Sequence, residues 1–215
     1  MKFWLWPCRI DYGMAWVTGG KHFGQYTYEH WFDEDFEIRR ESIMQKEIVK
    51  IYVDYNKSVN DTMNGIIKTL SQAEWEKPLG GYFPSVRSLC SHIYISDFNW
   101  LKRLRGFKTF AALNDPLFDK TYSHKETLFE NMGEYLSARS DMDNRMSAFV
   151  NELTDADLGG TLKFTDPHGK VQEQNFGGCV LRFLTHEIHH RGGISVYLDM
   201  LGRDNDFSSL GQVLK

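Results

Sequence analysis

Cysteines and prolines are scarce in this sequence, and hydrophobic residues form no long run. The 215 residues include 3 cysteines and 5 prolines. Because Cys8, Cys90 and Cys179 are odd in number and form no CxxC pair, we expect reduced thiols in a cytoplasmic protein rather than a disulfide-stapled scaffold. No apolar run approaches the roughly 18 residues that a membrane-spanning helix needs. These absences argue against a membrane partner.

The sequence also lacks a strong charge of either sign. It contains 25 Lys and Arg against 29 Asp and Glu, with a net charge of −4 and an isoelectric point near 6.1. A nucleic-acid-binding domain normally needs a basic face, so we expect no nucleic-acid partner. Hydrophobic residues make up 41% and charged residues 25%, which are ordinary values for one globular domain with a substantial core.

Histidine is concentrated near the C-terminus, in the sequence HEIHHRG at residues 186–192. On an α-helix, residues four apart lie about 40° apart around the axis and about 6 Å apart along it. His186 and His190 can therefore bind one cation, whereas His189 points elsewhere. A helix with polar residues on a solvated face would explain one histidine but not three within an apolar stretch. The spacing therefore favours a metal site.

The same residues fit the HExxH pattern of zinc metallohydrolases, in which the glutamate is the general base. Such an enzyme needs a third ligand further along the chain. The extended pattern would place it at Val196, which cannot bind zinc, and no glutamate follows Glu187. We keep a metallohydrolase as a minor alternative. Glu187 points about 100° away from the histidine face, so we expect it on the surface or in an ion pair between helices.

A third ligand is available upstream in the helical stretch 85–101, for which Ser85 is a plausible N-cap. His92 borders the apolar stripe of this stretch. A lone histidine there would more often be a core residue than a ligand. Three imidazoles with one open position are, however, a known catalytic zinc arrangement, which favours His92 as a ligand beside His186 and His190.

The apolar periodicity predicts an all-α fold, an antiparallel four-helix bundle with a β-hairpin before the last helix. The links are expected to be short, except for a long loop that contains residues 114–116. In the first helix, we expect Ile48, Tyr52, Tyr55, Val59 and Met63 on the buried side. The expected helices cover residues 43–70, from 85 onward, 125–153 and 177–202, and the hairpin covers residues 162–173.

Apolar residues show no clear helical or strand periodicity in segment 1–43, which contains four of the six tryptophans. The segment is either an added loop that packs on the bundle or an extension upstream of a native start at Met44, where the helical pattern begins. We favour the extension. The predicted domains are therefore an aromatic-rich extension, 1–43, and the bundle, 44–215.

A helix with one histidine, followed about ninety residues later by HxxxHRG, resembles the DinB/YfiT-like superfamily. The resemblance runs from about Met44 to Gly202 and includes Tyr55-Asn56 and the segments 70–74 and 197–202. It implies a four-helix bundle that holds a divalent metal, usually zinc or nickel, through histidines at the positions of His92, His186 and His190. The family usually has glutamine after HRG, whereas this chain has Gly193.

The resemblance also suggests a chemistry, because members of this superfamily include S-transferases and an isomerase that use low-molecular-weight thiols. We therefore expect metal-dependent transfer of such a thiol to a small electrophile; the alternative is a non-catalytic, metal-stabilised stress-response or binding module. A homodimer remains open. Ser96, Asn99 and Tyr197 share the ligand faces, and we expect them to support the ligands or face the substrate, or simply to line the bundle.

Overall fold

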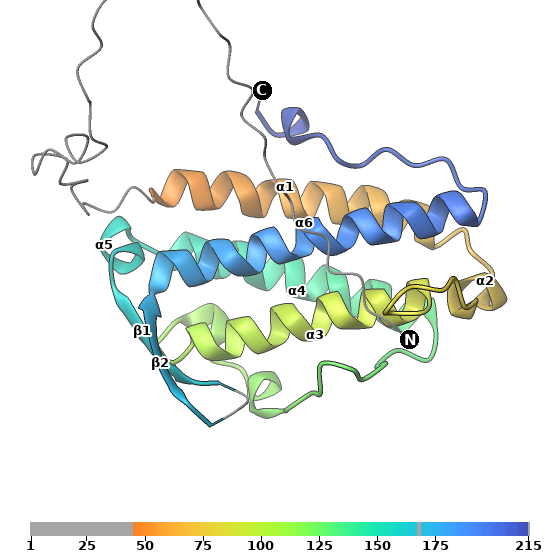
Figure 1. The fold of residues 1–215 in the computed structure, drawn as a ribbon. Coiled ribbons are helices and arrows are strands. Elements are labelled where there is room, and N and C mark those ends of the chain that lie inside the picture. Colours follow the sequence, from red (N-terminus) through yellow and green to blue (C-terminus); the bar gives the residue numbers. More distant parts are fainter. Residues whose placement is uncertain (1–44, 167–168, 215) are drawn as a thin grey trace, which may run out of the picture. The chain divides into compact units, whose positions relative to one another are not determined.

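The computed structural model describes residues 45–166 and 169–214 (Figure 1). The predicted N-terminal extension, residues 1–43, lies outside the described residues. Among those described, no helix is both long and apolar enough to cross a membrane.

Four long helices lie side by side and enclose the core (Figure 1). The prediction of an all-α fold with a hairpin before the last helix is confirmed. The long helices are α1 (Lys46–Ile67), α3 (Val86–Leu104), α4 (Met132–Glu152) and α6 (Phe176–Met200). The short elements are α2 (Gln72–Glu76), η2 (Ala111–Leu113), η3 (Pro116–Asp119), α5 (Asp155–Leu158), β1 (Thr161–Thr165), β2 (Val171–Asn175) and η4 (Leu210–Gln212).

The chain direction is antiparallel within two pairs of helices, α1 with α4 and α3 with α6 (Figure 1). The link between α3 and α4, residues 105–131, is long and runs back along the bundle, so α4 points the same way as α3. This link contains residues 114–116, which were predicted to lie in a long loop. The pairing of α3 with α6 brings the two histidine-bearing helices into direct contact.

Polar caps fix the ends of the helices that carry the histidines. The Ser85 hydroxyl accepts a hydrogen bond from the Ser88 backbone N–H at 3.1 Å, as predicted for the start of α3. Asn175 Oδ1 accepts from the Gly178 N–H at 2.7 Å and starts α6. Gly202, with φ +69°, follows the end of α6 in the left-handed conformation that favours glycine.

Two helix predictions needed correction. Helix α4 begins at Met132 rather than near residue 125, because Asn131 caps it and the Leu128 N–H is tied to the Ser91 hydroxyl at 3.2 Å. In α1 the buried face begins with Val49 rather than Ile48, whereas Tyr52 is partly buried and packs against the core. Ile48 is 40% exposed.

From Tyr55 onward, the predicted stripe of α1 is buried as expected, including Val59 and Met63. The hairpin pairs Leu162 with Gln174 and Phe164 with Gln172 in antiparallel register. Because side chains alternate along a strand, these four share one face of the hairpin. Figure 1 shows the hairpin at the end of the bundle where α3 ends and α6 begins.

Candidate metal centre

The three predicted histidines meet between α3 and α6. The Nε2 atom of His190 lies 3.2 Å from Nε2 of His92 and 3.0 Å from Nε2 of His186. One nitrogen from each ring lies within 4.8 Å of the others, so the three side chains form a group that can hold a metal ion. His189, by contrast, is exposed to solvent, as its spacing predicted.

These separations suit a shared ion. Two nitrogens each about 2.0 Å from one tetrahedral zinc ion would be about 3.3 Å apart. When the proton of each ring is on Nδ1, all three Nε2 atoms offer a lone pair to a cation between them. The donor set therefore fits a divalent cation such as zinc or nickel.

Hydrogen bonds on the opposite ring nitrogens leave Nε2 available for an ion. Nδ1 of His92 lies 3.3 Å from the backbone carbonyl of His124, which can only accept, so Nδ1 carries the proton. Nδ1 of His186 lies 3.1 Å from the Ser96 hydroxyl, which can accept from it in the same way. Such outer contacts orient metal-ligating histidines in proteins.

The site also favours neutral imidazoles, the form that binds metal. Burial lowers the pKa of His186 to about 4, with a further contribution from His92. Burial and the neighbouring His186 lower the pKa of His190 to about 3. Burial also lowers the pKa of His92, which is only 8% exposed. At neutral pH all three rings are uncharged.

Phe83 covers one side of this group. Its ring stacks on His92 with centroids 4.0 Å apart. The Tyr197 hydroxyl donates to the Phe83 backbone carbonyl at 2.6 Å, and Gly81 leaves room for that hydroxyl, since a Cβ there would lie 2.0 Å from it. Tyr197 thus reaches the histidines only through Phe83 and does not line the cavity beside them.

A cavity of about 410 Å³ opens beside the histidines, and both His92 and His186 line it. Ser96 also lines it, whereas Asn99, half-buried on the same helix, does not. The other walls come from the end of α3, the loop at His124, the hairpin and the start of α6. They are formed by Trp100, Arg103, His124, Phe164, Asp166, Gln172, Gln174 and Arg182.

Gly193, which stands where the family usually has glutamine, allows α3 and α6 to approach closely. A Cβ at this position would lie 3.1 Å from Cδ2 of Leu89, tighter than ordinary contact. Helix α6 nevertheless continues without a break through both Gly192 and Gly193.

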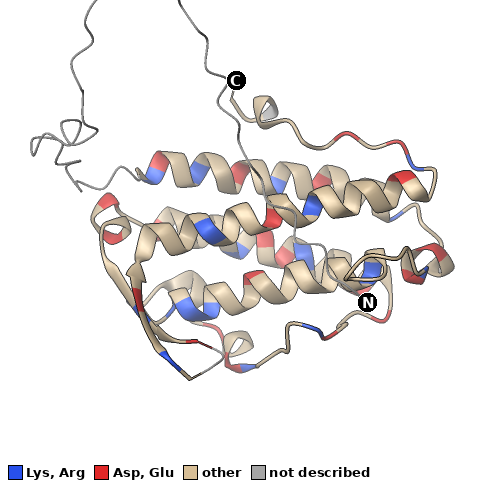
Figure 2. Ribbon diagram, viewed as in Figure 1, with Lys and Arg blue, Asp and Glu red and all other residues tan. Residues whose placement is uncertain are grey.

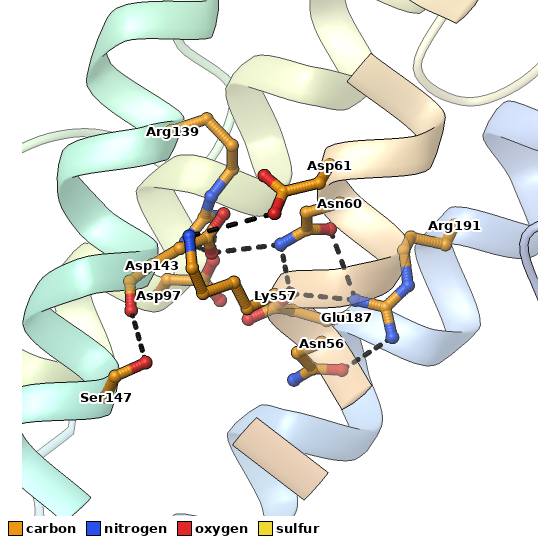
Figure 3. A network of polar contacts seen from close by, with 10 residues as sticks. All are labelled: Asn56, Lys57, Asn60, Asp61, Asp97, Arg139, Asp143, Ser147, Glu187 and Arg191. Atoms are coloured by element: carbon orange, nitrogen blue, oxygen red, sulfur yellow. Dashed lines mark hydrogen bonds and ion pairs between the residues drawn. The ribbon is translucent and has the colours of Figure 1, made fainter. Parts of the chain in front are cut away.

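Glu187 lies behind the histidines in a buried polar network, not on the surface (Figure 3). It is 0% exposed and pairs with Arg191, one turn along α6, at 2.9 Å. Asn60 of α1 donates to the same carboxylate oxygen at 3.3 Å, and Arg191 donates to Asn56 of α1 at 2.6 Å. Of the two locations expected for Glu187, the surface is wrong, because α1 supplies polar partners in the core. The ion pair is formed within α6, and the contact to another helix is the hydrogen bond from Asn60.

The network continues into α4 and α3 (Figure 3). Asn60 donates to Asp143 at 3.0 Å, Arg139 pairs with Asp143 at 2.8 Å, and Arg139 also pairs with Asp97. Figure 2 shows the corresponding charged segments in the middle of the long helices. All four long helices are thereby joined by polar contacts immediately behind the histidines.

Three carboxyl groups, those of Asp97, Asp143 and Glu187, meet two guanidiniums in this network, and the surroundings disfavour ionisation of two of the acids. Burial and the charge of Glu187 raise the pKa of Asp97. Burial raises the pKa of Asp143 to about 6, although Arg139 opposes the shift. The sequence analysis did not identify Asp97, Arg139 and Asp143 as buried residues. The available signal was that Arg139 and Asp143 lie at the helical spacing of the buried Tyr135, Met142 and Met146.

Comparison with known proteins agrees with this fold. Residues 44–207 match the model of the DinB family. The chain is 24% identical over 156 residues to protein DinB of Bacillus subtilis (strain 168), covering 71% of this chain and 85% of that protein. The crystal structure of a DinB-like protein, YjoA, from Bacillus subtilis superposes with a TM-score of 0.52 at 17% identity, covering 72% of this chain and 94% of that one. Since the family model matches well over half of its length, the chain belongs to the DinB family.

Proposed function

We propose that His92, His186 and His190 bind one divalent ion, zinc or nickel, and that this ion serves thiol transfer to a small electrophile. The observation that carries the proposal is the convergence of three neutral Nε2 atoms, 3.0 and 3.2 Å apart, beside a cavity of small-molecule size. Buried free thiols at Cys90 and Cys179 support the expectation of a reducing, cytoplasmic location.

The residues around the site have separate tasks in this proposal. His124 and Ser96 hold two of the rings in the orientation that presents Nε2. Phe83 excludes water from one side of His92. An ion bound to three histidines would keep one position for a thiol and lower its pKa, which makes a thiolate nucleophile available at neutral pH.

A non-catalytic, metal-stabilised module is the second candidate, because the buried network could serve stability alone. The metallohydrolase alternative loses support from Glu187. A general base must reach a water molecule in the active site, but this carboxylate is fully buried and bonded to Arg191 and Asn60.

Metal analysis and thermal unfolding test the metal site. We expect one equivalent of zinc or nickel in the purified protein. A ligand present at a hundredfold its Kd stabilises the folded state by about 2.7 kcal/mol. For a domain of this size, that corresponds to a rise in Tm of about 5–11 °C.

The variant His190→Ala should lose the bound metal and the rise in Tm, whereas the control His189→Ala should keep both, because His189 is exposed beside the site. An unchanged metal response in His190→Ala would refute the ligand assignment.

Thiol transfer is tested with a panel of cellular thiols and a small electrophile. Conjugation should require both the metal and the thiol, and His186→Ala should abolish it. Full activity after the metal has been removed, and shown to be gone, would contradict the catalytic role. Metal binding without any turnover would leave the non-catalytic module.

A further inference from the structure

Two arginines line the cavity beside the histidines. Arg103 lies on the last turn of α3 and Arg182 near the start of α6. Their guanidinium carbons lie 4.9 and 5.5 Å from the ring centroid of the same residue, Trp100. The Trp100 ring therefore contacts two positively charged guanidinium groups at one wall of the cavity.

No ion pair formed among the described residues involves either arginine, although other arginines of the chain form them. Arg105, two residues from Arg103, pairs with Asp119 at 3.0 Å. The acid that lines this cavity, Asp166, accepts hydrogen bonds from the Lys170 N–H at 3.0 Å and from the Gln172 side chain at 2.9 Å.

The two arginines also interact with each other electrostatically. Burial, and after it the charge of Arg182, lowers the pKa of Arg103, whereas Cys179 and Asp166 oppose this shift. Both arginines line the same cavity as His92 and His186. An anion entering the cavity would relieve the repulsion between the guanidiniums.

From these observations, we infer that Arg103 and Arg182 form an anion subsite that binds a carboxylate or phosphate group of the substrate. Guanidinium forks match the geometry of both anions. Arg182 is one helical turn before His186, about 6 Å along the axis, so a small molecule held there can extend toward the histidines. The side-chain amides of Gln172 and Gln174 offer further donors on the hairpin wall. As a statement about substrate class, the inference rests on the proposed function.

Three six-carbon probes that differ only in their head group test the subsite, namely hexanoate, hexyl phosphate and hexan-1-ol. Binding is followed through the arginine Nε–H signals in NMR spectra and by calorimetry, with the full chain in zinc-loaded and metal-free form. We expect at least one of the two anions to bind about ten- to a hundredfold more tightly than the alcohol, and the Arg103 and Arg182 signals to shift. The preferred anion identifies the head group.

The variants Arg103→Gln and Arg182→Gln should each remove most of this preference, whereas Arg105→Gln should keep it. Arg182 is exposed, so its variant tests the subsite even if Arg103→Gln folds poorly. Equal binding of anions and alcohol, or an equal loss in Arg105→Gln, would overturn the inference.

The two proposals can fail separately. Preference for the anion in a protein that binds no metal would support the subsite and contradict the metal site. Metal binding without a preference for the anion would support the metal site and contradict the anion subsite.

Discussion

Replacing Arg139 by methionine would test how the buried network is held together. Arg139 is 0% exposed and pairs with Asp97 and Asp143, both buried. Methionine keeps much of the length of the side chain but removes the charge, so two carboxylates are left in the core without their cation. Breaking a buried pair in this way typically costs about 3–5 kcal/mol. For a domain of this size, we expect Tm to fall by about 6–20 °C near neutral pH.

The loss should depend on pH, because the stranded carboxylates can take up protons. Protonating a carboxyl group of ordinary pKa, about 3.9, costs about 4.9 kcal/mol at pH 7.5 but only about 1.5 kcal/mol at pH 5. At pH 5, each carboxylate that has lost Arg139 can therefore take up a proton at a small cost. The free energy lost by burying it without a cation is then much smaller than at pH 7.5. The difference in stability between the two proteins should shrink by about half or more at pH 5.

The sign follows from the direction of the pKa shifts. Burial already raises the pKa of Asp143 to about 6 in the intact network and raises that of Asp97 as well. A carboxyl group with a raised pKa in the folded state contributes stability at low pH, which is lost as the pH rises through that pKa. Without Arg139 both pKa values should rise further, which moves this loss to higher pH.

Urea unfolding of metal-free protein at pH 5 and pH 7.5 measures both effects. Arg145→Met is the matched control, since Arg145 lies on the same helix and pairs with Asp115 at 2.8 Å in a half-exposed position. Its loss should stay below about 1 kcal/mol at both pH values. If Arg139→Met cost as little as this control, or cost the same at both pH values, the charged network would not act as described.

Two further predictions concern the histidines and the loop that covers them. Gly81→Ala should lower stability by about 1–3 kcal/mol, because its Cβ would lie 2.0 Å from the Tyr197 hydroxyl oxygen. Gly65→Ala on α1 meets nothing within 4 Å and should stabilise by up to about 1 kcal/mol, so equal Tm values for the two variants would contradict this packing. The metal-free protein should lose stability as the pH falls from 6.5 toward 4, because the pKa values of His186 and His190 are lowered to about 4 and 3 and the unfolded chain binds more protons. In a variant with both histidines replaced by alanine this part of the pH dependence should disappear, and an unchanged Tm profile would be evidence against it.

Local signals in the sequence determined the helical fold and the histidine group. Four residues make about one helical turn, so the spacing of His186 and His190 placed both on one face wherever α6 packed. Ser85 at the start of α3 and the glycine after α6 fixed helix ends through backbone chemistry that depends on few neighbours. The selection of His92 needed the family resemblance in addition, because one histidine at the edge of an apolar stripe has no unique interpretation.

Tertiary packing alone decided which of several equivalent patterns was buried. Ile48 and Val49 are neighbours that both fit a four-residue apolar spacing, with Tyr52 and Val53 respectively. Periodicity therefore could not determine that Val49 is buried and Ile48 exposed. Tyr197 shares the ligand face of α6 but bonds to the Phe83 carbonyl instead, a contact between residues far apart in the sequence.

Local sequence patterns likewise did not predict the buried polar network. Glu187, Arg139 and Asp97 are charged residues that a single helix would leave in water. In the core, Arg139 of α4 pairs with Asp97 of α3, and Glu187 has Arg191 of its own helix and Asn60 of α1 as partners. The cavity has the same origin, since Arg103, Arg182 and the hairpin come from separate segments. A sequence specifies spacing along one element, whereas burial of charge depends on which elements meet, and that was decided only when the four helices packed.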